Sequence, residues 1–149
     1  MNNSIDRKQI LREFLNNIAG LADEEYQQRV WIEVKGPECD DIDDTVDDFL
    51  EDEFILKKYK DFGITEHQHK LLIKLQVKVK DFAEKYSVFY PYKSTEKLVQ
   101  IPEWQEIRNI AKEVIAAFNH KRTDWKILQK LIFRLMNLVI EEAINYDIN

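Results

Sequence analysis

The chain has 149 residues, of which 34% are charged and 44% hydrophobic, and its formal net charge is −6. This length fits a single domain that buries roughly two-thirds of its unfolded surface, and only three glycines and three prolines argue against a loop-rich β architecture. The one cysteine, Cys39, excludes an intramolecular disulfide, and the first residues show no signal-peptide pattern, so we expect a cytoplasmic protein.

The first helix is predicted from Ser4, which can cap it, to about Ala19. Gly20 follows at the position where a helix C-terminus commonly uses a left-handed residue. The expected apolar face repeats at helical spacing and consists of Ile10, Leu11, Phe14, Leu15 and Ile18.

A second helix is predicted after Asp23, which can cap it, with Tyr26, Val30 and Val34 at steps of four residues. Residues 29–35 read Arg-Val-Trp-Ile-Glu-Val-Lys, and their alternation and β-branched content would also suit a strand. We favour a helix here and keep the strand open. Gly36-Pro37 ends the element in either case.

Residues 36–53 hold ten carboxylates and no lysine or arginine. Removing these ten from a net charge of −6 leaves +4 for the rest of the chain, so the excess acidity is concentrated in about an eighth of it. The segment is also predicted to be a helix, because its apolar residues follow helical spacing, at Ile42, Val46, Phe49 and Leu50. The stripe must anchor the helix, because like charges one turn apart cost ~0.2–0.5 kcal/mol per pair.

Two further helices are predicted before residue 87. Residues 54–62 form a short helix stopped by Gly63, and Thr65 with Gln68 makes a capping box that opens a long helix to about Tyr86. The inward side chains of the long helix are expected to be Leu71, Leu72, Leu75, Val79, Phe82 and Ala83.

Residues 87–100 show no clear period and are predicted to be a long ordered loop. The next helix starts at 101–104 with Pro102 near its first position, and Asn119-His120 ends it. The last helix, about 124–145, is apolar around much of its circumference, so we expect it to be the central element of the core. The predicted fold is therefore a single all-α domain, an irregular bundle of about six helices.

One enzymatic alternative stays open. Carboxylate-rich helices build magnesium sites in all-α nucleotide pyrophosphohydrolases, and such a site here would use Glu38, Asp41, Asp44 and Asp48, with Glu141 and Glu142 of the last helix. We find no histidines at ligand spacing and no phosphate loop, so we predict no catalytic residues, metal or cofactor.

The favoured interpretation is a protein-binding surface. Concentrated carboxylates can attract and steer a basic protein partner. They repel nucleic acid, which is itself negatively charged. The alternative, that the carboxylates only form a solvated surface without a partner, stays open. We predict that the contacts come from the acidic segment and from aromatic anchors near it. The predicted binding residues are Glu38, Asp40, Asp41, Asp43, Asp44, Asp47, Asp48, Glu51, Trp31, Tyr90 and Tyr92.

Residues 31–49 read Trp-Ile-Glu-Val-Lys-Gly-Pro-Glu-Cys-Asp-Asp-Ile-Asp-Asp-Thr-Val-Asp-Asp-Phe, and residues 58–65 read Lys-Tyr-Lys-Asp-Phe-Gly-Ile-Thr. Together these segments resemble small bacterial immunity proteins. These belong to contact-dependent growth inhibition and related polymorphic toxin systems. The resemblance covers roughly residues 30–75 and implies a cytoplasmic, non-enzymatic inhibitor. It would bind the C-terminal domain of a cognate toxin, in particular a basic nuclease. No binding residue is carried over from the family, and the toxin's identity and the oligomeric state stay open.

Overall fold

The computed structural model describes residues 3–86, 94–121 and 125–148, with side chains for 6–86, 94–121 and 131–146. Every regular element in these ranges is a helix, which confirms the all-α prediction. In chain order they are α1 (Asn3–Ala22), α2 (Glu24–Tyr26), the π-helix η1 (Gln27–Ile32), α3 (Ile42–Glu51), α4 (Glu53–Lys57), the 3-10 helix η2 (Tyr59–Phe62), α5 (Glu66–Tyr86), α6 (Thr95–Leu98), α7 (Pro102–Ala117) and α8 (Trp125–Ile148).

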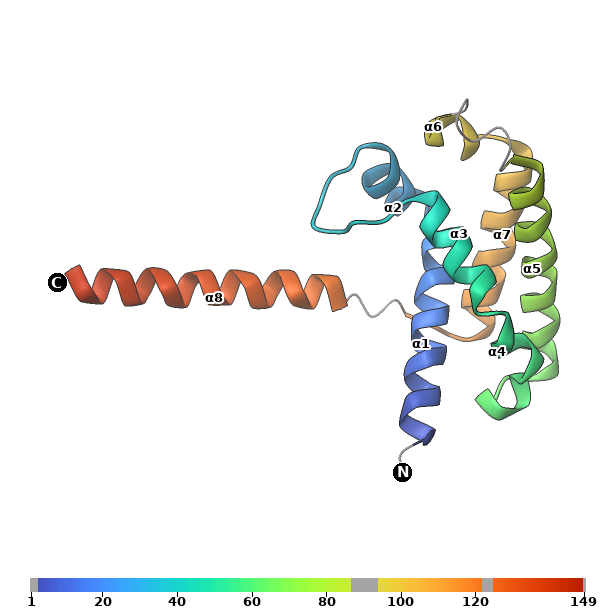
Figure 1. Cartoon of the computed structure of the whole chain (residues 1–149), viewed down its shortest axis with the longest axis horizontal. Helices are drawn as coiled ribbons and strands as arrows, with labels where there is room; N and C mark the ends of the chain where they lie inside the picture. Colours follow the sequence, from blue (N-terminus) through green and yellow to red (C-terminus); the bar gives the residue numbers. More distant parts are fainter. Residues whose placement is uncertain (1–2, 87–93, 122–124, 149) are drawn as a thin grey trace.

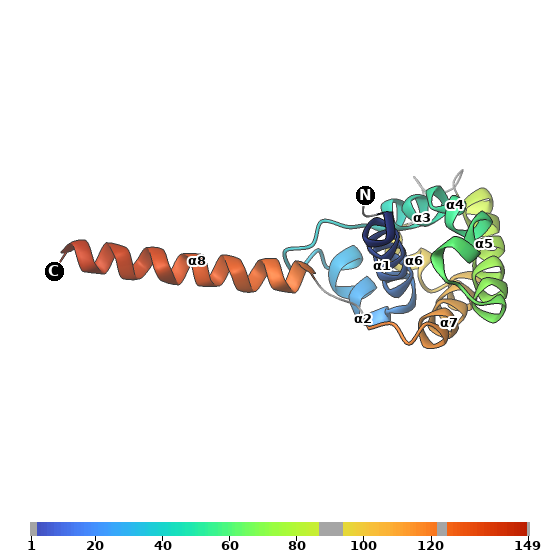
Figure 2. The same ribbon diagram turned by 90° about the horizontal axis from the view of Figure 1, so that it is seen from below.

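Helices α1 to α7 form one compact body (Figure 1). Helix α7 packs against both α1 and α5, and α3 crosses over the same two helices (Figures 1 and 2). The apolar stripes of these four helices meet in the centre, where Phe14, Leu72, Trp104 and Ile107 are almost completely buried. The stripes predicted for α1, α3 and α5 therefore face the core as expected.

Several predicted helix ends are confirmed. The side chain of Asp23 accepts a hydrogen bond of 3.0 Å from the backbone N–H of Tyr26. Thr65 and Gln68 form the reciprocal capping box, with bonds of 2.9 and 3.2 Å. Gly63 ends η2 with a left-handed φ of 71°, and Pro102 is the first residue of α7.

The prediction that α1 ends at Gly20 is wrong, because the helix continues to Ala22. The Gln27 side chain folds back and donates hydrogen bonds of 2.9 and 2.8 Å to the carbonyls of Gly20 and Leu21. These carbonyls at the end of α1 would otherwise lack a partner. A left-handed glycine is therefore not needed to close the helix.

The strand alternative for residues 29–35 is also wrong. The backbone stays helical to Ile32 in π geometry, and Val34 then has a positive φ of 54°. The predicted loop 87–100 contains a short helix, α6, whose N-cap Ser94 accepts from the backbone of Lys97. Residues 87–93, with the predicted anchors Tyr90 and Tyr92, lie outside the described residues.

Helix α8 is not the centre of the core, which overturns that prediction. It extends away from the body on the side opposite α5 (Figures 1 and 2), and every side chain from Leu131 to Tyr146 is exposed. Among the described residues, the buried core cluster is built from residues 14–114, and no side chain of 131–146 belongs to it. An apolar circumference predicts burial but not the surface against which the helix is buried. In the described ranges, the structure contains no helix with the length and apolar character needed to span a membrane.

Candidate protein-binding site

Helix α3 is held to the body by its predicted apolar stripe. Ile42, Val46 and Phe49 are buried, and the Phe49 ring stacks on Phe14 of α1 with centroids 5.7 Å apart. The carboxylate of Asp41 caps the helix by accepting a 2.7 Å hydrogen bond from the backbone N–H of Asp44. These contacts fix the helix with its opposite side toward solvent.

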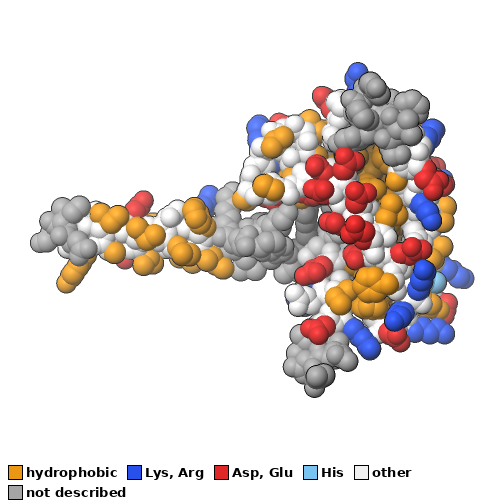
Figure 3. Space-filling model, viewed as in Figure 1, with side chains coloured by type: hydrophobic (Ala, Val, Ile, Leu, Met, Phe, Trp, Pro, Cys, Tyr) orange, Lys and Arg blue, Asp and Glu red, His pale blue; other side chains and the backbone are white. Residues whose placement is uncertain are grey.

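That opposite side carries five exposed carboxylates, which we call the acidic face. Figure 3 shows acidic side chains gathered over α3 at the middle of the body. Within the described residues, no ion pair to lysine or arginine neutralises Asp44, Asp47, Asp48 or Glu51 of this face. The acidic face consists of Asp43, Asp44, Asp47, Asp48 and Glu51.

Burial, and after it the crowding of these charges, raises two pKa values near the C-terminal end of α3. The pKa of Asp48 is raised by partial burial and then by repulsion from Glu51 and Asp44. The pKa of Asp52 is raised by burial and then by Asp48 and Glu51. Negative charges at this end also oppose the helix dipole. The carboxylates near the C-terminal end of α3 therefore act against helix stability.

Asp40 has a structural role that the sequence did not reveal. Its carboxylate accepts hydrogen bonds from the Tyr26 hydroxyl at 2.7 Å, the Trp31 indole N–H at 3.3 Å and the Thr45 hydroxyl at 3.0 Å. Three segments of the chain meet at this half-buried group, including the buried Thr45 of α3. Asp40 thus joins α2 and η1 to the start of α3 instead of facing a partner.

Glu38 is likewise engaged within the chain. Its carboxylate pairs with the Arg29 guanidinium, and the same guanidinium donates to the carbonyl of Lys35 at 3.2 Å. The pair closes the turn around Gly36, whose φ of 108° favours glycine. Of the eight predicted carboxylates, the structure therefore places five on the acidic face and uses Glu38, Asp40 and Asp41 to build the site.

Trp31 is not available as a surface anchor, which corrects its predicted role. It is only 6% exposed, and its ring lies edge-on to Trp104 and Tyr26 at centroid distances of 5.9 and 6.2 Å. The π-helix η1 turns this residue toward the core. Its indole N–H is used by Asp40.

An apolar pocket of about 80 Å³ lies directly beside the acidic face. Its polar rim comes from Asp43 and Asp47, and its apolar lining comes from α3, α5 and α6. Sequence reasoning did not assign this pocket, because the α6 segment was expected to be loop. The apolar lining residues are Ile42, Val46, Phe82, Ala83, Tyr86 and Leu98.

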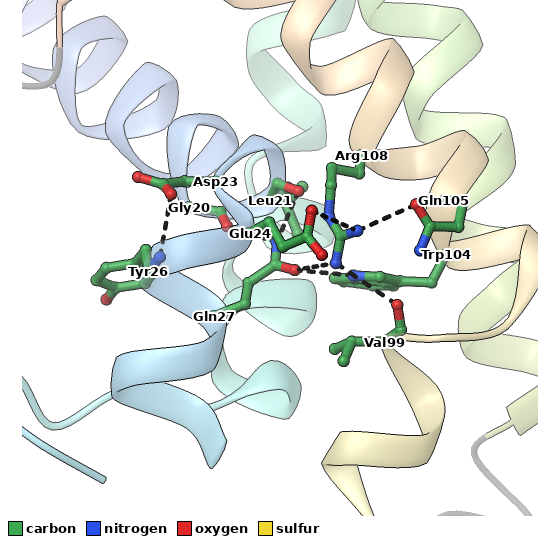
Figure 4. Close-up of polar contacts among 10 residues, drawn as sticks. All are labelled: Gly20, Leu21, Asp23, Glu24, Tyr26, Gln27, Val99, Trp104, Gln105 and Arg108. Atoms are coloured by element: carbon green, nitrogen blue, oxygen red, sulfur yellow. Dashed lines mark hydrogen bonds and ion pairs between the residues drawn. The ribbon is translucent and has the colours of Figure 1, made fainter. Parts of the chain in front are cut away.

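A buried polar network joins η1 and α7 to Val99, the C-cap of α6 (Figure 4). Gln27 Oε1 accepts hydrogen bonds from the Trp104 indole N–H at 3.1 Å and from Arg108 Nη2 at 2.8 Å. Arg108 also donates to Gln105 and pairs with Glu24 at 3.6 Å. The network is structural, since Gln27 Oε1 gives the buried Trp104 and Arg108 side chains an acceptor in the interior, although Arg108 Nε is buried without a hydrogen-bond partner among the described residues.

The acids proposed for a magnesium site are not brought together. Glu38 pairs with Arg29, Asp41 caps α3, and Glu141 and Glu142 lie on the projecting α8 (Figure 1). Among the described residues, no three acidic, histidine or cysteine side chains are grouped as metal ligands.

Comparison with protein-family models, with curated proteins and with solved structures gave no match. The candidate site therefore rests on the geometry and charge of the chain itself.

Proposed function

We propose that the protein is an immunity protein that binds and neutralises the C-terminal domain of a cognate toxin in the cytoplasm. The toxin class would be that of contact-dependent growth inhibition or a related system. The observation that carries the proposal is the acidic face, five exposed carboxylates on less than three turns of an anchored helix. Because their mutual repulsion opposes helix stability, these charges are better explained by a partner than by folding.

A basic nuclease domain fits this surface best. The active site of a nuclease is basic because its substrate is a polyanion, and a row of carboxylates presents a similar charge. Complementary charge also speeds association above the ~10⁵–10⁶ M⁻¹s⁻¹ of unsteered protein pairs. The pocket beside Asp43 and Asp47 could receive an apolar side chain of the toxin, which would supply a buried anchor next to the charged contacts.

The first step tests by affinity capture whether the protein binds the product of the gene that lies next to the gene of this protein. Inhibition of the captured toxin is then compared between the native protein and D43N/D44N/D47N/D48N. We expect the variant to fold, because neutralisation relieves repulsion, and to bind at least about tenfold more weakly, mainly through slower association. Added salt should weaken binding of the native protein and have less effect on the variant.

A matched control is the triple variant E84Q/E96Q/E113Q, which removes exposed acids from α5, α6 and α7. It should leave inhibition unchanged. Full protection by the α3 variant at unchanged affinity would contradict the proposal and leave the acidic face as a solvated surface.

A further inference from the structure

Helix α8 exposes an apolar surface that is too large for a helix in water. Its ten large hydrophobic side chains from Leu131 to Tyr146 are each at least 50% exposed. Fully burying such a side chain removes roughly 60–120 Å² of apolar surface, so together they offer on the order of 1,000 Å². The largest apolar patch on a typical monomer is about 300–600 Å², and a stable interface buries about 800 Å² per partner. Summed around the helix, the apolar surface of α8 therefore exceeds what a monomer ordinarily exposes, and pairing along one side would cover part of it.

The body of the same chain offers α8 no matching surface. Its core is filled by its own helices, and its exposed large hydrophobics are few. In the described residues they are Val34 after η1, Phe54 on α4, and Ile73 and Val77 one turn apart on α5. Folding α8 back onto the body would therefore bury little apolar surface on the body's side.

One side of α8 has the geometry of a helix-pairing surface. Ile132, Leu135, Met136, Val139 and Ile140 line a single apolar groove and follow the spacing i, i+3, i+4, i+7, i+8. We call these five residues the α8 stripe. Helices pair along such a stripe by inserting side chains of one into the gaps of the other. Asn137 and Asn145 fall on other sides of the helix.

The charges of α8 indicate which partner fits. Its basic residues, Lys126, Lys130 and Arg134, all precede its acidic ones, Glu141, Glu142 and Asp147. This order is the reverse of the one that stabilises an isolated helix, in which acids lie near the N-terminus and bases near the C-terminus. Two copies in antiparallel orientation place the basic half of each against the acidic half of the other. A parallel pair would place like charges together.

We propose that α8 is a self-association helix that pairs antiparallel with α8 of a second copy through the α8 stripe. In this dimer, the two paired α8 helices connect the body of one copy to the body of the other. It leaves the acidic face of each copy open, because α3 belongs to the body and α8 extends away from it (Figure 1).

The first measurement is the mass of the full chain by size-exclusion chromatography with light scattering, over a concentration series. We expect twice the chain mass of 17.9 kDa. The variant L135N/V139N loses apolar contacts in both copies and should raise the dimer dissociation constant by at least about a hundredfold. The control N137Q/N145Q changes two residues outside the α8 stripe and should remain dimeric.

A charge exchange tests the antiparallel orientation. K126E/K130E leaves Arg134 as the only base in the sequence of α8 and makes the helix mainly acidic, whereas E141K/E142K leaves Asp147 as its only acid and makes it mainly basic. Each variant alone should dimerise at least about tenfold more weakly, whereas an equimolar mixture should recover the dimer. If neither K126E/K130E nor E141K/E142K weakens the dimer, the antiparallel orientation is wrong. A parallel pair already brings like charges together in the native protein, so neither variant would add repulsion to it.

Two results would overturn the proposal as a whole. One is a native chain of monomer mass throughout the series. The other is a dimer that persists in L135N/V139N, which would place the interface elsewhere. The body serves as an internal folding control, because near-ultraviolet circular dichroism from its buried Trp31 and Trp104 should be unchanged in every α8 variant.

Discussion

The hydroxyl of Tyr26 donates a 2.7 Å hydrogen bond to the carboxylate of Asp40, fourteen residues further along the chain. The same carboxylate accepts from Trp31 and Thr45. One acid of the most acidic segment is therefore a junction of the fold, while its neighbours on α3 face solvent. This division makes the structural and the binding roles of the segment separable by mutation.

Replacing Asp40 with Ala should destabilise the protein by about 2–4 kcal/mol. The change removes the hydrogen bonds that Tyr26, Trp31 and Thr45 donate to this carboxylate, at ~1–3 kcal/mol for a buried donor that loses its acceptor. Urea denaturation followed by tryptophan fluorescence measures the loss. Asp44→Ala, at an exposed position of the same segment, is the matched control and should change stability by less than about 0.5 kcal/mol. Equal effects of the two substitutions would show that Asp40 is not a junction.

Replacing Gln27 with Ala should cost about 3–5 kcal/mol. Trp104 and Arg108 would lose their shared acceptor, and the Arg108 guanidinium would stay buried with fewer partners. Gln28→Ala, at the exposed neighbouring position, should be close to neutral. Denaturation midpoints of the two variants give the comparison, and a small loss for Gln27→Ala would mean that water replaces its contacts.

The pair D48N/D52N should stabilise the protein at neutral pH, by ~0.2–0.5 kcal/mol for each like-charge contact removed. Both carboxyls have a raised pKa in the folded state, so the native protein binds more protons than the unfolded chain at pH values just above 3.8, the ordinary pKa of an aspartate. Stability contributed by these groups therefore falls as pH rises through that window. The advantage of the variant should shrink as pH is lowered toward 3.8 and disappear below it.

Thermal unfolding of both proteins from pH 7 down to pH 3 measures this difference. The control D6N/D61N, at exposed positions of α1 and η2, should show no such pH-dependent gain. If the stability of D48N/D52N relative to the native protein increased as the pH was lowered, the direction assigned to the two pKa shifts would be wrong.

Filling the pocket beside the acidic face should separate its role from that of the charges. Ala83→Leu adds a larger side chain to the pocket lining, and we expect the fold to be retained and toxin affinity to fall about tenfold or more. Salt dependence should be unchanged, because no charge is altered. Ala116→Leu on the exposed side of α7 is the matched control. Unchanged affinity for Ala83→Leu would exclude the pocket from the interface.

Local patterns in the sequence were sufficient to predict the helices and several of their ends. The stripe of α3, the Asp23 cap, the Thr65–Gln68 capping box and the Gly63 stop depend on residues only a few positions apart. Such short-range preferences act before any tertiary contact forms. The same locality explains why the acidic segment could be recognised as an anchored helix with a charged outer side.

The tertiary structure alone decided which residues of that segment face solvent. Asp40 and Asp44 look alike in sequence, yet one is surrounded by donors from α2, η1 and α3 and the other is exposed. Trp31 is buried because Trp104, which lies far along the chain, packs against it. The apolar circumference of α8 predicted burial, but whether its partner lies in the same chain depends on how completely the other helices fill the core. Contacts between distant segments settle such questions, and no local period encodes them.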